Sequence, residues 1–234
     1  MLESLKKAVC EANLRLVEEG LVVHTFGNAS GLDREHGLMA IKPSGVPYAE
    51  LRPAHMVVVA LDGGKIVEGK LKPSSDTETH LELYRAFDGI GGIVHTHSFH
   101  ATAWAQTGQG IPALGTTHAD YFHGEVPCTR PLTPSEIKKD YEYNTGRVIV
   151  ERFKDLDPMH CPAVLVAHHG PFTWGLDAAA AVENAAALEF VARLAAETLR
   201  LRPGTAAMPD ELHHKHFFRK HGPSAHYGQT KRNK

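Results

Sequence analysis

Two histidines, His95 and His97, have the residue type and the spacing needed to bind a metal ion. They follow a short apolar run, Ile93-Val94, that is typical of a β-strand. Along a strand, residues i and i+2 point to the same face and lie roughly 6.5–7 Å apart. A catalytic zinc site has three protein ligands and one open position, and neutral imidazole is a common ligand. The sequence therefore predicts a metal site whose third ligand comes from another segment.

The pair alone leaves alternatives open. The chain has 17 histidines, so a His-x-His pair also arises by chance. Dinuclear hydrolases use the same spacing, but they place an aspartate two residues after the second histidine, where this chain has Phe99. The pattern argues against that class and leaves a metal site and a chance pair as the two interpretations.

Three polar segments are suited to an anion. Asn28 lies in a Gly-Asn-Ala-Ser turn, Lys42–Gly45 reads Lys-Pro-Ser-Gly, and Ser74-Ser75 precedes an expected helix. Hydroxyl groups, free backbone N–H groups and a lysine together form a phosphate cradle. Each segment alone is ordinary turn or capping chemistry, and Ser75 is equally well explained as a helix N-cap. Only their combination with the metal strand favours a phosphorylated substrate.

Composition limits the class of protein. At 234 residues, the chain is long enough for one sizeable domain with a full core and a cavity. Its 25 basic and 27 acidic residues nearly balance, so no overall charge indicates nucleic acid or an anionic membrane as a partner. The N-terminal segment MLESLKKAVCEANL lacks the apolar core of a signal peptide, and no stretch reaches transmembrane length. Cys10, Cys128 and Cys161 are widely spaced, which fits a reducing compartment. We expect a soluble, cytoplasmic protein.

The elements that position these residues alternate irregularly along the chain. Helices are expected over Leu2–Leu16, within Lys72–Phe87 after an N-cap at Ser75, over His100–Gln106, from Thr133-Pro134, and from Asp177 to about Leu201. Strands are expected in Leu21–Ser30, which runs into a loop at Gly27-Asn28, and in Met39–Val46, which ends in a Pro-Ser-Gly turn. Met56–Leu61 and Lys65–Glu68 are expected to form a hairpin around Asp62-Gly63-Gly64. Further strands are expected over Ile93–His97 and Ala163–Ala167. Val148–Phe153 is ambiguous between the two. The order is not a plain βαβ repeat, so it favours an α/β or α+β layered domain.

Three helix starts carry specific capping signals. Ser75 with Glu78 three residues later predicts a capping box, and Thr133 with Glu136 predicts another, with proline at the first helical position. Asp177 is expected to cap the long alanine-rich helix. From His213 the chain is basic and rich in histidine and aromatic residues, which fits a solvated terminus. Its basic density is too low for a nucleic-acid-binding arm.

Seven segments, in order, resemble the class II aldolase/epimerase family. They are GNAS at 27–30, KPSG at 42–45, KPSSDTETH at 72–80, GGIVHTHSFHATAWA at 91–105, GTTHADYF at 115–122, HGPFTWG at 169–175 and RKHGPSAHYGQ at 219–229. The resemblance implies a three-layer αβα sandwich with a central, mainly antiparallel sheet, and it favours helix for Val148–Phe153. It also implies one domain over residues 1–229, followed by a flexible extension at 230–234.

The resemblance further implies a divalent metal, usually zinc, with Mn²⁺ or Co²⁺ as alternatives. Its ligands would be His95, His97 and His169, with Asp76 beside the metal as ligand, catalytic partner or both. His168 would face the other way along a strand. The implied phosphate contacts are Asn28, Lys42, Ser44, Gly45, Ser74 and Ser75. The implied substrate site includes Thr116, Asp120, Glu142, His216, Arg219 and Tyr227. In the family, the active site lies at a subunit boundary of a homotetramer. The resemblance implies that the neighbouring subunit supplies Asp120 and Tyr227 to this site.

The implied activity is that of the branch that interconverts L-ribulose 5-phosphate and D-xylulose 5-phosphate. The hydrogen on C4 is not acidic, so simple deprotonation is a poor route to inversion there. Cleavage of the C3–C4 bond is feasible, because the electrons enter an enediolate that a Lewis-acidic metal stabilises. Rotation of the aldehyde fragment and renewed attack then invert C4. Asp120 and Tyr227 are the candidate proton-transfer groups on the two faces.

Two other functions compete with epimerisation. A true aldolase would release the aldehyde, but aldolase relatives tend to carry glutamate where this chain has Asp76, and their C-terminal segments differ. The intact His-Tyr-Gly-Gln at 226–229 also favours the epimerase. A non-catalytic metal-binding protein would leave the phosphate-type segments unexplained.

Overall fold

A single seven-stranded sheet forms the centre of the computed structural model, which describes residues 2–221 and 225. The strands are β1 (Asn28–Asp33), β2 (Leu38–Ile41), β3 (Val57–Ala60), β4 (Ile66–Glu68), β5 (Gly92–His95), β6 (Ala163–Val166) and β7 (Gly170–Gly175). Their order is β4-β3-β2-β1-β5-β7-β6, and each neighbouring pair is antiparallel. The expected antiparallel sheet and the expected β3–β4 hairpin are confirmed.

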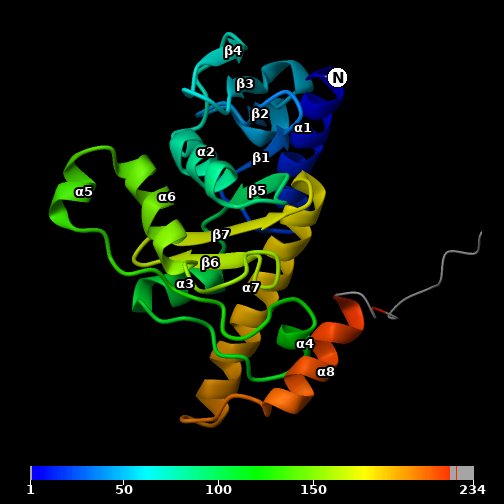
Figure 1. Cartoon of the computed structure of the whole chain (residues 1–234), viewed down its shortest axis with the longest axis vertical. Helices are drawn as coiled ribbons and strands as arrows, with labels where there is room; N and C mark the ends of the chain where they lie inside the picture. Colours follow the sequence, from blue (N-terminus) through cyan, green and yellow to red (C-terminus); the bar gives the residue numbers. More distant parts are fainter. Residues whose placement is uncertain (1, 222–224, 226–234) are drawn as a thin grey trace, which may run out of the picture.

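Helices cover both faces of this sheet (Figure 1). They are α1 (Leu2–Glu18), α2 (Thr77–Ala86), α3 (Phe99–Thr107), α4 (Thr116–Ala119), α5 (Pro134–Lys138), α6 (Tyr141–Arg152), α7 (Ala178–Leu201) and α8 (Asp210–Lys220), with 3-10 turns at Tyr48–Glu50 and Pro53–His55. In Figure 1, α1 and α7 lie on one side of the sheet, and α2 and α6 lie on the other. The fold is therefore the three-layer αβα sandwich that the resemblance implied.

The alternation of side chains along β5 supplies both halves of the core. Ile93 packs in a cluster that includes Leu81 of α2, whereas the next residue, Val94, packs with Val9 of α1 and Val182 of α7. Successive residues of a strand face opposite sides of the sheet, so each layer of helices receives its own apolar stripe. His95 continues the Ile93 face, which directs its ring toward the side of α2 and α6.

Two of the expected helix starts are confirmed in atomic detail. The carboxylate of Asp177 accepts a hydrogen bond from the Ala180 amide at 2.8 Å and caps α7. Thr133 and Glu136 form the reciprocal capping box of α5. Both signals are local in sequence, because the cap and its partner lie within one turn of each other. The ambiguous segment at Val148–Phe153 is helical through Arg152, as part of α6.

The capping box expected from Ser75 and Glu78 is wrong. Helix α2 begins at Thr77 with Asp76 at its N-cap position, and no side chain makes a capping hydrogen bond there. The expected strand Leu21–Ser30 is also wrong over most of its length, because β1 begins only at Asn28. His24 and Gly27 have φ angles of 55° and 79°, which an extended strand cannot accommodate.

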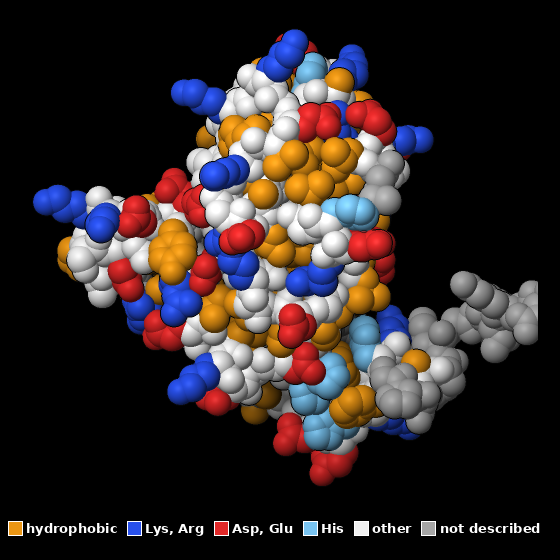
Figure 2. All heavy atoms as spheres, turned by 45° about the horizontal axis from the view of Figure 1, so that its top comes forward, with side chains coloured by type: hydrophobic (Ala, Val, Ile, Leu, Met, Phe, Trp, Pro, Cys, Tyr) orange, Lys and Arg blue, Asp and Glu red, His pale blue; other side chains and the backbone are white. Residues whose placement is uncertain are grey.

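The segment from His213 was expected to be a solvated terminus, but residues Asp210–Lys220 form helix α8. Its Phe217 is fully buried, and the ring of His123 lies 5.0 Å from it between centroids. Histidine side chains gather at the end of the molecule that α8 covers (Figure 2). The expectations for Tyr227 and for a flexible 230–234 fall outside the described residues. No helix among the described residues is long and apolar enough to cross a membrane.

Candidate metal centre and substrate pocket

Strand register brings the polar segments of the sequence together at one end of the inner strands β1, β5 and β7. Asn28, the first residue of β1, pairs with His95, the last residue of β5. His95 in turn pairs with Phe172 near the start of β7. Because adjacent strands run antiparallel, the first residues of one strand lie beside the last residues of its neighbour. Segments far apart in sequence therefore meet around His95.

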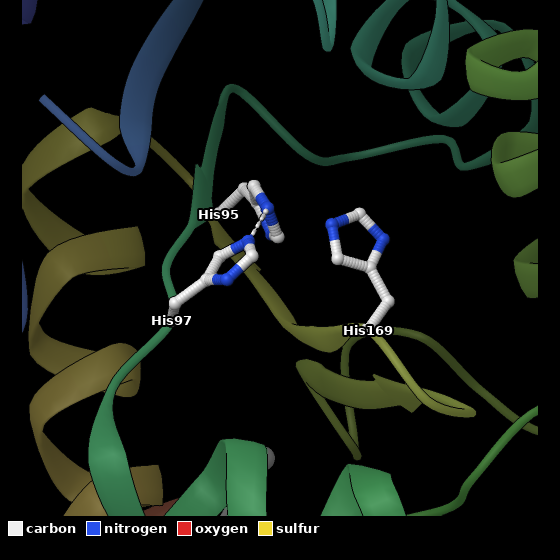
Figure 3. Close-up of side chains that lie close together, drawn as sticks. All are labelled: His95, His97 and His169. Atoms are coloured by element: carbon white, nitrogen blue, oxygen red, sulfur yellow. Dashed lines mark hydrogen bonds between the residues drawn. The ribbon is translucent and has the colours of Figure 1, made fainter.

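Three histidines point toward one another at this end of the strands (Figure 3). His95 ends β5, His97 follows it by two residues, and His169 lies in the turn between β6 and β7. One ligand atom from each lies within 4.8 Å of the others, and the Nε2 atoms of His95 and His97 are 3.1 Å apart. The structure thus brings together the three histidines that the resemblance named as metal ligands.

His168 and His169 lie in a turn, so the expectation that they alternate along a strand is wrong. The strand expected over Ala163–Ala167 ends at Val166, and His168 adopts a left-handed conformation with φ of 62°. The side chain of His168 is exposed, whereas His169 joins the cluster. The turn, rather than strand alternation, separates the two histidines.

A hydrogen bond fixes the tautomer of His95. Its Nδ1 lies 2.9 Å from the carbonyl oxygen of Pro171, and a carbonyl can only accept, so Nδ1 carries the proton. The lone pair is then on Nε2, the atom that faces His97. The His95 ring also stacks on Phe172, with centroids 4.2 Å apart. Metal-binding histidines typically have such contacts with residues that do not bind the metal, because these contacts fix the orientation of the ring and its tautomer.

The surroundings favour the neutral form of His97 and His169, which is the form that binds a metal. Burial, together with the neighbouring His95 and His97, lowers the pKa of His169 to about 3. Burial and His95 also lower the pKa of His97. Three imidazoles with converging nitrogens match the donor set of a mononuclear divalent-metal site. The residues present therefore fit a metal.

Asp76 lies in the same pocket but outside the close set of three ligand atoms. Its Oδ2 accepts a hydrogen bond from Asn28 Nδ2 at 2.7 Å. Burial raises the pKa of Asp76, but His95, His80 and the Asn28 amide outweigh burial, and the net pKa lies below its usual value. The Asp76 carboxylate is therefore ionised. It faces the pocket and does not cap α2.

A pocket of about 360 Å³ surrounds these groups. It is lined by Thr25, Phe26, Gly27, Asn28, Lys42, Pro43, Ser44, Gly45, Ser74, Ser75, Asp76, His95, His97, Tyr141, Glu142 and His169. All six residues expected to contact phosphate are among them. The metal ligands and the anion-type segments thus share one cavity.

The two segments rich in serine are held side by side by backbone hydrogen bonds. The Ser44 amide donates to the Lys72 carbonyl at 2.9 Å, and the Ser74 amide donates to the Lys42 carbonyl at 3.0 Å. An isolated bridge between Pro43 and Pro73 lies between these two bonds. We call residues 42–45 and 72–75 the paired loops. Their pairing places hydroxyl groups from both segments around one part of the pocket.

Lys42, the first residue of the paired loops, is buried, at 2% exposure. Burial lowers the pKa of its ammonium group. Among the described residues, no carboxylate lies within ion-pair distance of Lys42, and the one hydrogen bond of its Nζ is a long one, 3.4 Å, to the Pro43 carbonyl. A buried cation without a counter-charge is costly, so the pocket is prepared for an anionic ligand.

Comparison with known proteins identifies the family. Residues 7–196 match the family described as Class II Aldolase and Adducin N-terminal domain. The chain belongs to the class II aldolase and adducin family. Two relatives named L-ribulose-5-phosphate 4-epimerase UlaF, from Salmonella paratyphi A and Salmonella typhi, are each 54% identical over 228 residues, covering 97% of this chain and 100% of the relative.

Solved structures of class II aldolase relatives have the same fold. An L-fuculose 1-phosphate aldolase aligns with a TM-score of 0.78 and 28% identity, covering 92% of this chain and 95% of its own. YgbL from Escherichia coli, described as a putative aldolase/epimerase/decarboxylase, aligns with a TM-score of 0.73 and 24% identity over 92% of this chain and 99% of its own.

Four residues that the class II aldolase resemblance placed at the substrate site lie away from this pocket: Thr116, Asp120, His216 and Arg219. Asp120 directly follows α4 and is held by α8. Arg219 Nη2 lies 3.0 Å from both of its carboxylate oxygens, and His216 Nδ1 lies 3.1 Å from one. The Nζ of Lys220 lies 3.4 Å from Oδ2 of the same carboxylate. Within one chain, this group forms a separate cluster, which we call the Asp120 cluster.

Five residues that line the pocket were not among the predicted site residues: Thr25, Phe26, Gly27, Pro43 and Tyr141. Two of them, Tyr141 and Phe26, lie beside the metal ligands. Tyr141 opens α6, and its hydroxyl lies 3.4 Å from His169 Nδ1, which leaves the other ring nitrogen, Nε2, for a metal. Phe26 lies at the pocket with its ring centroid 5.9 Å from that of His97. Neither residue belongs to a motif with local spacing. The only signal for Tyr141 was its position next to Glu142, which the class II aldolase resemblance did single out.

Proposed function

We propose that this chain is a metal-dependent L-ribulose-5-phosphate 4-epimerase, which interconverts L-ribulose 5-phosphate and D-xylulose 5-phosphate. The observation that carries the proposal is the shared cavity: three converging histidines lie beside a buried, uncompensated lysine and the paired loops. A phosphorylated sugar fits both halves of that cavity. The 54% identity to proteins named for this reaction, over nearly the whole chain, supports the choice of substrate.

The metal's ligands would be His95, His97 and His169, with Asp76 beside them. A divalent cation bound there, which we take to be zinc, supplies Lewis acidity that polarises a ketone. The protein itself keeps His97 and His169 neutral. It also fixes the ring of His95 through the Pro171 carbonyl and the stacked Phe172. Asn28 holds the Asp76 carboxylate by its hydrogen bond at 2.7 Å.

Phosphate binding is the task of Lys42 and the paired loops. The Lys42 ammonium group would pair with the phosphate of the substrate, while the hydroxyls of Ser44, Ser74 and Ser75 would donate to its oxygens. Because the phosphate is attached to C5, this contact retains the two-carbon aldehyde fragment after the C3–C4 bond breaks. Retention lets the fragment rotate and recombine, which separates epimerisation from aldol cleavage.

Proton transfer at the C4 hydroxyl requires a group on each face of the aldehyde. Burial raises the pKa of Asp120, but Arg219 and His216 outweigh burial and leave a carboxylate that can accept a proton. Asp120 lies outside the pocket of its own chain, so we propose that a neighbouring subunit supplies it, together with Tyr227, in a homotetramer. Asp120 would take the proton on one face, and Tyr227 would return it on the other.

Aldol cleavage of a ketose 1-phosphate is the second candidate function. The structural similarity to an L-fuculose 1-phosphate aldolase, with a TM-score of 0.78, favours it. The two reactions share bond cleavage and differ in whether the aldehyde leaves. Product analysis therefore separates them.

The deciding experiment is a coupled assay of zinc-loaded protein with L-ribulose 5-phosphate, which detects D-xylulose 5-phosphate. We expect turnover that is lost with a chelator and restored by zinc. No xylulose phosphate, together with triose phosphate released from L-fuculose 1-phosphate, would identify an aldolase instead. In deuterated water, the product should retain hydrogen at C4, whereas deuterium there would contradict the cleavage route.

A further inference from the structure

Helix α3 begins immediately after the metal-ligand segment, and its first turn is capped from another helix. The N-cap residue of α3, Ser98, makes no side-chain capping bond within its own helix. Glu189, in the middle of α7, supplies the acceptor instead. Its carboxylate oxygens lie 2.9 and 3.1 Å from the His100 amide, and one lies 3.0 Å from the Ala101 amide.

The same carboxylate binds a side chain of α3. The Nδ1 of His100 lies 2.7 Å from Glu189 Oε1, and the two side chains are 29% and 20% exposed. Burial raises the pKa of Glu189, but the amides of His100 and Ala101 and the His100 ring outweigh burial, and the net pKa is lowered. Glu189 is therefore ionised at neutral pH. A negative charge at a helix N-terminus is stabilised by the free amides and the helix dipole.

This cap lies next to the least supported metal ligand. His95 is buried in β5 and bonded to Pro171, whereas His97 follows the end of β5 and is the most exposed residue of the three. Figure 3 shows the chain leaving His97 and running into α3, beside α7. Only Ser98 separates His97 from the first residue of α3, so the position of that helix determines where the His97 backbone lies.

The other end of the His97 segment is also fixed. The Thr96 amide donates to the Pro171 carbonyl, although at a long 3.4 Å. A Cβ atom at Gly170 would lie 2.8 Å from the Thr96 carbonyl oxygen, so β7 can approach this closely only with glycine there. The segment at 96–98 is thus held by β7 on one side and by Glu189 on the other.

We infer that Glu189 is a positioning residue for the metal centre, which sets the direction of His97 by anchoring the start of α3. The inference rests on the metal site of the proposed function and adds a residue that touches neither metal nor substrate. A carboxylate is suited to the task because it accepts from two amides and the His100 ring at once. Glutamine at this position has one acceptor oxygen and no charge.

The test compares Glu189→Gln and Glu189→Ala with Glu183→Gln, which changes an exposed carboxylate on the same helix. Zinc affinity is measured without substrate, by competition with a chromophoric chelator, and the Co²⁺-loaded proteins are compared by visible absorption. We expect both Glu189 variants to bind zinc roughly 10- to 100-fold more weakly, with an altered Co²⁺ spectrum. Glu183→Gln should match the wild type. The KM for sugar phosphate should stay unchanged, because the paired loops are untouched.

Wild-type zinc affinity and Co²⁺ spectrum in a folded Glu189→Gln would overturn the inference. Failure of both Glu189 variants to fold would also overturn it, by assigning the residue to stability alone. Because zinc affinity is read without turnover, a wild-type protein that binds zinc but does not epimerise would refute the proposed function and leave the role of Glu189 standing.

Discussion

The ammonium group of Lys42 lies over the ring of Tyr48, with Nζ 4.8 Å from the ring centroid. The Tyr48 hydroxyl donates to the carbonyls of Phe26 and Gly27 at 3.0 and 2.9 Å. One tyrosine thus supports the buried cation by a cation–π contact and fixes the loop that leads into β1. The contact partly offsets the cost of desolvating the Lys42 ammonium group, but it supplies no negative charge. A bound anionic ligand would supply that charge.

Replacing Lys42 by methionine should therefore affect binding and stability in opposite directions. We expect the KM for the sugar phosphate to rise about 10- to 100-fold, the value of one charged hydrogen bond. The ligand-free protein should be at least as stable as the wild type, because an uncompensated buried charge has been removed. Steady-state kinetics and thermal unfolding measure the two effects. Lys72→Met, which changes an exposed side chain of the same loops, is the control, and an equal KM in both variants would contradict the assignment.

Metal content should depend on His97 and His169 but not on His168. Loss of one of three protein ligands abolishes tight binding, so His97→Ala and His169→Ala should retain little zinc after dialysis. The control is His168→Asn, because asparagine tolerates the left-handed backbone at that position, where φ is 62°. Elemental analysis of the dialysed proteins gives the answer. Equal zinc in all three variants would rule out the histidine cluster as the metal site.

Subunit mixing tests whether Asp120 acts in a neighbouring subunit. His97→Ala lacks a metal ligand, and Asp120→Asn lacks the proposed proton acceptor, so each homo-oligomer should be inactive. After the two proteins are unfolded and refolded together, about a quarter of the sites in a cyclic tetramer would combine an intact pocket with an intact neighbour. Activity should recover to that fraction. No recovery from a mixed oligomer shown to form would place Asp120 and the metal in the same chain, or Asp120 outside the reaction.

His118 should make the stability of the fold depend on pH. Its Nε2 donates to the Gly124 carbonyl at 2.7 Å, and burial lowers its pKa to about 4 from the ordinary 6.5. Between these two values the unfolded chain binds a proton that the folded chain does not, so stability falls as the pH falls. The contribution of His118 amounts to about 2 kcal/mol between pH 7 and pH 5.

Urea unfolding of the zinc-free protein across this pH range measures the effect. His118→Gln keeps a donor for Gly124 but cannot titrate, so its stability should fall less steeply than that of the wild type. His24→Asn, which changes an exposed histidine, should leave the slope unchanged. Parallel curves for the wild type and His118→Gln would show that His118 titrates normally in the folded protein.

The residue sequence by itself determined the features that depend on short-range geometry. Asp177 and Thr133 cap their helices as expected, because each cap bonds to an amide within one turn. The spacing of His95 and His97 predicted that their nitrogens lie together, and they do, although β5 ends at His95 and His97 follows it. The ordered motifs identified the family, and with it the antiparallel sandwich.

Only the tertiary structure decided the features that depend on contacts between distant segments. The same carboxylate of Asp76 could cap α2 or face the pocket, and the Asn28 amide, 48 positions earlier, determines the choice. Helix α8 escaped detection because its stabilising contacts, such as that of Phe217 with His123, join residues far apart in sequence. A turn whose form follows from strand pairing selects His169 over His168, and a hydrogen bond across 89 positions links Glu189 to the start of α3. Strand register and packing determine these features, and both depend on contacts between distant segments that form only as the chain folds.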